Sequence, residues 1–278
     1  MKKEPTTERL TAEDQHSNRE AYLLYLIHLA TYKYCIPFIR GKVVLDYGCG
    51  TGYGTSLISE YCTQITGIDI SPEALSYAQS HFSAPNLNYL QIKPAEIAPL
   101  PFSDRSFDVI LSFQVIEHVQ DISAYLRELD RVLAPDGRVA IATPDRSARL
   151  FSFQKPWNLW HLREYTQTQL QDTLSEYFSD VNVLQTGGKP EILQTELKRI
   201  GRLKWLMLPF TLPFIPENIR KACLRLIKDL RYSLSSNSRS TSFTPDFDET
   251  AIKISAHEIF SVDLVAMARK KPFNPFPF

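Results

Sequence analysis

Net charge, cysteine and long apolar runs are all scarce in this chain of 278 residues. Its 31 Lys and Arg residues balance 31 Asp and Glu residues, so no overall field attracts nucleic acid, and no nucleic-acid partner is expected. The four cysteines lack C-x-x-C or metal-ligand spacing, which predicts free thiols and a reducing compartment. The N-terminus is polar, unlike a signal peptide, and the apolar stretch at 21–32 is too short to cross a bilayer. These absences favour a cytoplasmic protein.

Glycine is also scarce, but its distribution is uneven. Of the 10 glycines, Gly48, Gly50, Gly52 and Gly54 lie within seven residues, directly after the apolar run 43–45. This pattern predicts a buried strand that turns sharply into a helix. Glycine allows positive φ and close approach of the backbone to a ligand, and the helix N-terminus offers unpaired N–H groups. The spacing matches neither G-x-G-x-x-G nor the phosphate-binding P-loop, so the cluster indicates a cofactor loop of another type.

Two acidic residues stand at the ends of the first two predicted strands. Asp46 ends the strand at 42–47, and Asp69 ends the strand at 64–70, 23 residues later. Ser71 then begins a predicted helix. A carboxylate at the tip of the second strand can accept hydrogen bonds from both hydroxyls of a ribose. The order and spacing favour this binding role for Asp69 over a role in helix capping alone.

Several separated motifs within residues 40–145 resemble those of the class I S-adenosylmethionine-dependent methyltransferases, in the group with a type 11 domain. D-Y-G-C-G-T-G from Asp46 resembles their motif I. L-P-F-S-D-R-S-F-D from Leu100 and E-H-V from Glu117 resemble the entry to and exit from their fourth strand. The resemblance implies methyl transfer to a small-molecule, sugar or lipid-linked acceptor. The alternatives are an RNA or protein methyltransferase, which would need a basic groove near the glycine loop, and a non-catalytic module that only binds the cofactor.

The resemblance also implies a role for each residue around the glycine loop. The end of the first strand and the loop backbone would hold the methionine part of S-adenosylmethionine, Asp69 its ribose, and Ile70 its adenine. Pro94 replaces the Asp that often contacts the adenine amine in this family, so that contact would pass to the two residues that follow. The expected cofactor-binding residues are Asp46, Gly48, Cys49, Gly50, Asp69, Ile70, Ala95 and Glu96.

The acceptor side is expected after the fourth strand and in the segment from 157 to 166. His118 is a candidate general base, with a structural role in holding its loop as the alternative. The H-L-R-E-Y-T segment resembles one found in many small-molecule members, so His161, Arg163 and Tyr165 are candidates for acceptor binding, and His161 also for catalysis. Q-V-I-E-H at 114–118 resembles the metal-binding E-x-x-E-H of some RNA 2′-O-methyltransferases. Glutamine is a poorer ligand than the first carboxylate of that motif, so no metal is expected.

Strands and helices alternate along residues 42–187, which predicts right-handed βαβ units and a mostly parallel sheet. With the resemblance, this indicates an α/β, Rossmann-like fold with a seven-stranded sheet, helices on both faces and an antiparallel last strand. The strands are expected at 42–47, 64–70, 87–92, 107–113, 138–143, 180–186 and 261–269.

Residues 189–250 form an insertion before the expected last strand. Within 196–231, nine basic and three acidic residues give a net charge of 9 − 3 = +6, and an uncharged, proline-broken run separates two basic stretches. A helix predicted from Glu217 places Ile219, Cys223, Leu226 and Leu230 on one stripe. Such a segment can be a lid or structural cover whose apolar face packs on its own domain, can contact a membrane peripherally, or can bind a protein partner. The expected division is a helical cap (1–40), a methyltransferase core (41–188), the insertion with a Ser-rich linker (189–250), a final strand (251–270) and a tail (271–278).

Overall fold

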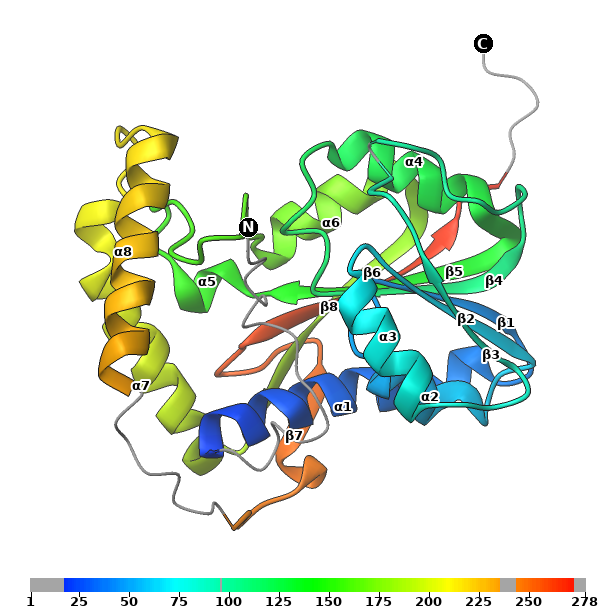
Figure 1. The fold of residues 1–278 in the computed structure, drawn as a ribbon, viewed down its shortest axis with the longest axis horizontal. Helices are drawn as coiled ribbons and strands as arrows, with labels where there is room; N and C mark the ends of the chain where they lie inside the picture. Colours follow the sequence, from blue (N-terminus) through cyan, green and yellow to red (C-terminus); the bar gives the residue numbers. More distant parts are fainter. Residues whose placement is uncertain (1–17, 96, 236–243, 273–278) are drawn as a thin grey trace.

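A computed structural model describes residues 18–95, 97–235 and 244–272 of the chain. It contains one sheet in the order β3-β2-β1-β4-β5-β8-β6-β7, with helices on both faces (Figure 1). All strands run parallel except β7 and β8, which confirms the expected α/β fold. The strands are β1 (Val43–Tyr47), β2 (Gln64–Asp69), β3 (Leu87–Gln91), β4 (Phe107–Phe113), β5 (Leu133–Pro144), β6 (Phe178–Gly188), β7 (Ile252–Ser255) and β8 (Asp263–Lys270).

The sheet has eight strands, so the expected count of seven is wrong. The segment 251–270 was expected to form one final strand, but it contains both β7 and β8. β7 pairs with the end of β6, where Ile252 lies opposite Gly188. It has only four residues and a burial pattern without clear alternation, so it leaves no period-2 signal in the sequence.

Side-chain caps fix the starts of most helices that follow the strands. Ser71 accepts a hydrogen bond from the Ala74 amide, as its position predicts, and Thr166 forms a capping box with Gln169. The helices are α1 (Arg19–Ile39), α2 (Tyr53–Ser59), α3 (Pro72–His81), α4 (Ile122–Val132), α5 (Arg146–Arg149), α6 (Gln167–Ser175), α7 (Pro190–Leu206) and α8 (Glu217–Ser235), with short 3-10 turns η2 (Leu208–Phe210) and η3 (Glu249–Ala251).

Two apolar layers hold the helices against the sheet. α4 and α6 cover one face through side chains such as Leu126 and Leu170, and α1 and α2 cover the other through Cys35 and Ile58. These four side chains are fully buried. Burial on both faces fixes the sheet, and the loops at the carboxyl ends of its central strands then lie along one edge, where ligands bind in open α/β folds.

α7 and α8 stand beside the sheet, at the left in Figure 1. The predicted apolar stripe of α8 faces solvent, since Ile219, Leu226 and Leu230 are 50%, 61% and 55% exposed. The opposite side of the helix is buried, with Leu224 packed against α7 and Arg220 only 1% exposed. The expected stripe therefore does not pack on its own domain, and the other side of the helix does so instead. No helix in the described ranges is long and apolar enough to span a bilayer.

Candidate active site

The glycine cluster forms the turn between β1 and α2. Gly48, Gly50 and Gly52 have φ of +82°, +56° and +78°, in the left-handed region that side chains disfavour. A Cβ on Gly48 would lie 2.4 Å from Cγ2 of Val115, in the loop after β4. The Gly48 amide donates to the carbonyl of Ile68 at 2.7 Å. The loop therefore lies tightly against the ends of both neighbouring strands, and only glycine fits at position 48.

Asp69 holds this loop from the end of β2. Its side chain is nearly buried, and its Oδ2 accepts a hydrogen bond from the Gly50 amide at 3.0 Å. Its Oδ1 accepts one from the Ser71 amide at 2.8 Å. Because an ionised carboxylate can accept about four hydrogen bonds, these two contacts are compatible with binding of a ribose diol as well. Asp69 thus combines the position expected for a ribose ligand with a structural contact to the loop.

Asp46 lies beneath the loop. Its carboxylate accepts hydrogen bonds from Thr55 Oγ1 at 2.6 Å and from Tyr32 Oη at 3.0 Å. Burial raises the pKa of Asp46 to about 6, although these hydrogen bonds act in the opposite direction. Asp46 does not line the cavity described next, whereas the loop residues do. Its position suits support of the loop from below through contacts with α1 and α2.

A cavity of about 980 Å³ opens at the carboxyl ends of β1, β2, β4 and β5. This volume is at the upper end of the range for ligand pockets. The glycine loop and Asp69 line one part of it, and α1 contributes His28 and Tyr32, which no motif signals. Two cationic side chains of α8, Lys221 and Arg225, also reach it. The cavity is therefore closed by elements from three separate parts of the chain.

The expected adenine side is only partly as the sequence predicts. Ile70, Ile92 and Pro94 line the cavity, which makes this part of its wall apolar. Ala95 is buried but does not line the cavity, and its amide donates to the hydroxyl of Tyr47 at 3.4 Å. Glu96 lies outside the described residues. Pro94 and Ile92 therefore occupy the place that the sequence assigns to Ala95.

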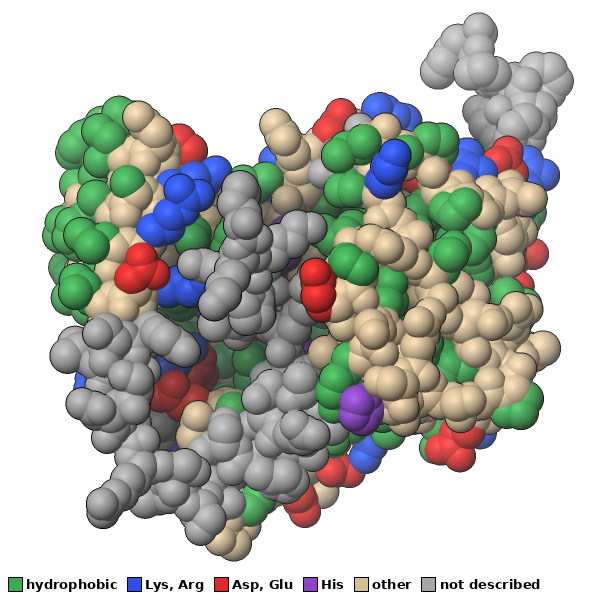
Figure 2. Space-filling model, in the orientation of Figure 1, with side chains coloured by type: hydrophobic (Ala, Val, Ile, Leu, Met, Phe, Trp, Pro, Cys, Tyr) green, Lys and Arg blue, Asp and Glu red, His purple; other side chains and the backbone are tan. Residues whose placement is uncertain are grey.

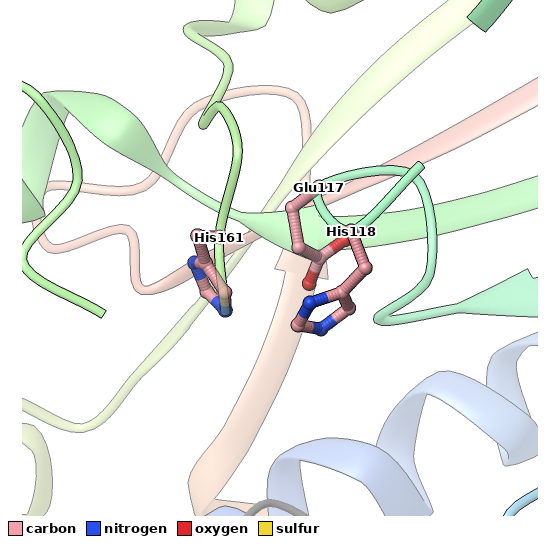
Figure 3. A group of neighbouring side chains, drawn as sticks. All are labelled: Glu117, His118 and His161. Carbon is pink, nitrogen blue, oxygen red and sulfur yellow. The ribbon is translucent and has the colours of Figure 1, made fainter. Parts of the chain in front are cut away.

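Glu117, His118 and His161 lie together in another part of the cavity (Figure 3). One carboxylate oxygen and one nitrogen from each ring all lie within 4.8 Å of one another. The two imidazoles meet edge to face, with their centroids 4.9 Å apart. The Leu162 amide donates to the Glu117 carbonyl at 2.9 Å, which joins the His161 segment to the loop after β4. The structure thus brings together the two predicted catalytic histidines.

The Glu117 carboxylate is fully buried. Its Oε2 accepts a hydrogen bond from Thr143 Oγ1 at 3.0 Å, while Oε1 has no hydrogen-bond partner within the described part of the chain. Burial raises the pKa of Glu117, and the two neighbouring imidazoles oppose that shift. A buried carboxylate oxygen without a partner is costly, so a proton or a positive charge beside this oxygen would stabilise the group.

Glu164 holds His161 in place. His161 Nδ1 lies 2.8 Å from Glu164 Oε1, and Arg149 Nε donates to Oε2 of the same carboxylate at 3.1 Å. Burial alone would raise the pKa of Glu164, but Arg149 and His161 hold it below its ordinary value. Glu164 is therefore ionised at neutral pH, accepts the Nδ1 proton and fixes the tautomer of His161.

Two other candidates from the segment 157–166, Arg163 and Tyr165, do not line the cavity. Arg163 donates to the carbonyl of Gln120 at 2.9 Å, and Tyr165 is buried. Neither lines the cavity, so the structure does not support their expected contact with the acceptor. Trp157 and Trp160 do line the cavity. Their place in the segment from 157 to 166 is the feature of the sequence that could have identified them.

Part of this chain is similar in sequence to known methyltransferases. A family model described as a methyltransferase domain matches residues 45–141. A probable S-adenosylmethionine-dependent methyltransferase of Mycobacterium tuberculosis is 34% identical over 177 residues, which are 63% of each chain. A ubiquinone biosynthesis O-methyltransferase of Pseudomonas fluorescens is 34% identical over 118 residues, 41% of this chain and 50% of that protein. This chain therefore spans less than two thirds of the length of these relatives.

Two further proteins show how widely the similarity extends. Norajmaline N-methyltransferase of Rauvolfia serpentina is 37% identical over 108 residues, 38% of this chain and 37% of that protein. An S-adenosylmethionine-dependent methyltransferase of Thermotoga maritima has the same fold, with a TM-score of 0.54 and 17% identity over 91% of this chain and 95% of that one.

Proposed function

We propose that this chain, which carries a class I S-adenosylmethionine-dependent methyltransferase domain, transfers a methyl group to a small-molecule, sugar or lipid-linked acceptor. The observation that carries the proposal is that one cavity is lined in one part by the glycine loop and Asp69 and in another by His118 and His161. The relatives named for ubiquinone and norajmaline support a small-molecule acceptor.

The residues present fit S-adenosylmethionine. The left-handed glycines leave a loop without side chains at Gly48 and Gly50, and Asp69 stands beside it with its acceptor oxygens. Ile70 and Pro94 offer an apolar wall for a base. The cofactor supplies a methyl group on a positively charged sulfur, which is already an activated leaving group. The protein then has mainly to orient the two reactants and exclude water.

In this reaction a lone pair of the acceptor forms the new bond to the methyl carbon, and the C–S electron pair passes to sulfur. An acceptor that is protonated at neutral pH must also lose a proton. His118 and His161 are the titratable side chains expected to contact the reacting group, together with the buried carboxylate of Glu117. Glu164 and Arg149 position His161 without lying at the centre of the cluster.

The insertion supports contact with a membrane surface. Trp205, Leu206 and Phe214 are 66%, 62% and 79% exposed, and the apolar stripe of α8 is exposed beside them. Figure 2 shows hydrophobic side chains along the outer edge of this region, with basic side chains next to them. Exposed aromatic and aliphatic side chains among cations are typical of segments that lie in an anionic membrane interface. Lys221 and Arg225 connect this surface to the cavity, so a lipid-linked acceptor could reach the site.

The acceptor is tested by a labelling screen. Protein and S-adenosylmethionine with a labelled methyl group are incubated with separated metabolite and lipid extracts, and Asp69→Ala protein serves as the control. We expect label in a lipid or small-molecule fraction with wild-type protein alone. Label confined to RNA or protein would contradict the proposed acceptor class, and absence of label from every fraction would favour a non-catalytic module.

Membrane contact is tested by sedimentation with vesicles of phosphatidylglycerol and phosphatidylcholine. We expect the full chain to sediment with the anionic vesicles and to be released by salt. A Trp205→Ser, Phe214→Ser double variant should bind the vesicles less than the wild type does. Ile97 is 70% exposed and lies outside the insertion, so Ile97→Ser serves as a control that should bind like the wild type. Equal sedimentation of all three proteins would contradict this role for the insertion.

A further inference from the structure

We propose that Glu117, His118 and His161 bind one divalent transition-metal ion, and that this ion binds a hydroxyl oxygen of the acceptor. The three candidate ligand atoms lie within 4.8 Å of one another, in the wall of the cavity that also contains Asp69. The role in acceptor binding rests on the proposed function, whereas binding of the ion does not.

The carboxylate of Glu117 is the first observation that indicates a cation. The side chain is fully buried, and Oε1 has no hydrogen-bond partner among the residues described. Figure 3 shows a carboxylate oxygen directed at the ring of His118. An ion at this position would compensate the buried negative charge, which the single hydrogen bond from Thr143 does only in part.

The two imidazoles are oriented as metal ligands usually are. His161 Nδ1 donates to Glu164, and His118 Nδ1 donates to the carbonyl of Trp160 at 3.1 Å. Neither of these partners can donate in return, so in each neutral ring Nε2 carries the lone pair. A carboxylate or carbonyl behind a histidine ligand fixes the ring and raises its basicity. Glu164 is itself fixed by Arg149, which completes this outer layer around His161.

The donor set selects the type of ion. Two imidazole nitrogens and one carboxylate oxygen suit Zn²⁺, Fe²⁺, Co²⁺ or Mn²⁺ better than Mg²⁺ or Ca²⁺, which prefer oxygen ligands. Ligand atoms around a tetrahedral ion are roughly 3.4 Å apart, so binding would draw the three side chains closer together. His118 is half-buried on a loop, which leaves it room to adjust. Three protein ligands leave a coordination position for a ligand in the cavity, as in catalytic zinc sites.

The position of the cluster explains how an ion would act on methyl transfer. Val115, two residues before Glu117, packs against Gly48 of the cofactor loop. A cation in the cluster therefore lies on a loop that contacts the cofactor loop. It would lower the pKa of a bound hydroxyl, whose proton passes to solvent. His118 and His161 then act as ligands instead of as a general base, and the acceptor class narrows to molecules that carry a hydroxyl group.

The ion is tested on the full chain after treatment with a chelator. Equilibrium dialysis against Zn²⁺, and absorption spectra with Co²⁺, should show one ion per chain that excess Mg²⁺ does not displace. Glu117→Gln and His118→Ala should each weaken binding at least tenfold, and Glu164→Gln should weaken it by roughly 10- to 100-fold. His81→Ala changes an exposed histidine outside the cavity and should bind the ion like the wild type. His118→Ala tests the site even where Glu117→Gln fails to fold.

Absence of Zn²⁺ binding by the wild type, or unchanged binding by folded Glu117→Gln and His118→Ala proteins, would overturn the site. Affinity for S-adenosylmethionine is measured on the same samples. A wild-type protein that does not bind S-adenosylmethionine would contradict the proposed function. The ion site would then still be confirmed or overturned by the Zn²⁺ dialysis. Once the screen has identified an acceptor, its O-methylation should require the bound ion. Methyl transfer without the ion would overturn the role of the ion in acceptor binding.

Discussion

The buried carboxylate of Asp46 predicts an unusual dependence of stability on pH. Burial raises its pKa from 3.8 to about 6 in the folded protein. The folded state therefore binds this proton more tightly than the unfolded state does. The resulting stabilisation is fully present below pH 4 and is lost as the pH rises through about 6. The difference between the two pKa values corresponds to about 3 kcal/mol in the free energy of unfolding.

Asp46→Asn removes this titration and keeps the shape of the side chain. The free energy of unfolding is measured by urea denaturation of the cofactor-free protein between pH 4 and pH 7.5. Because the other titrating groups are common to both proteins, the free energy of unfolding of the variant relative to that of the wild type should rise by about 2 kcal/mol from pH 4 to pH 7.5, since part of the full difference is already lost at pH 4. Asp136→Asn, at an exposed position, should show no such change. A difference between wild type and Asp46→Asn that does not vary with pH would refute the desolvation of Asp46.

Three further predictions concern the glycine loop and the insertion. Asp69→Ala removes the acceptor of the Gly50 amide and should weaken S-adenosylmethionine binding at least tenfold, about 1.4 kcal/mol, in calorimetry; unchanged affinity would remove the ribose assignment. Gly48→Ala combines a positive φ with a clash and should lower both the Tm and cofactor affinity in thermal-shift assays, and normal binding would contradict the tight loop. Arg220→Met removes the hydrogen bond from Arg220 to the carbonyl of Pro156 and should lower the free energy of unfolding by about 1–3 kcal/mol. Amide hydrogen exchange in α8 should become faster, and unchanged exchange would contradict a role of Arg220 in holding this helix.

Most of the fold follows from patterns that are local in the sequence. The strand before Asp46, the glycine turn and the cap at Ser71 each depend on neighbouring residues, so their order along the chain predicts the parallel sheet. β7 has too few residues for a periodic signal, and its pairing with β6 depends on a contact across the insertion. Helical spacing predicts that the apolar residues of α8 share one face. Spacing alone does not tell whether that face packs on its own domain or faces solvent, as it does here.

The site shows the same division. The position of Asp69 and the glycines at one cavity could be predicted because their spacing falls within one βαβ unit. The proximity of His161 to Glu117 and His118 depends on two loops that meet only in three dimensions. Glu164 was visible in the sequence only as part of a motif, and its contact with Arg149 has no sequence signature. Local patterns therefore predict the part of the cavity lined by the glycine loop better than the part lined by the histidines.

Calorimetric titration of the folded wild-type chain with S-adenosylmethionine tests whether the cavity beside the glycine loop and Asp69 binds this molecule. We expect one molecule to bind per chain, the demethylated product S-adenosylhomocysteine to displace it, and Asp69→Ala to weaken its binding greatly. A folded wild-type protein that binds neither molecule would contradict this expectation.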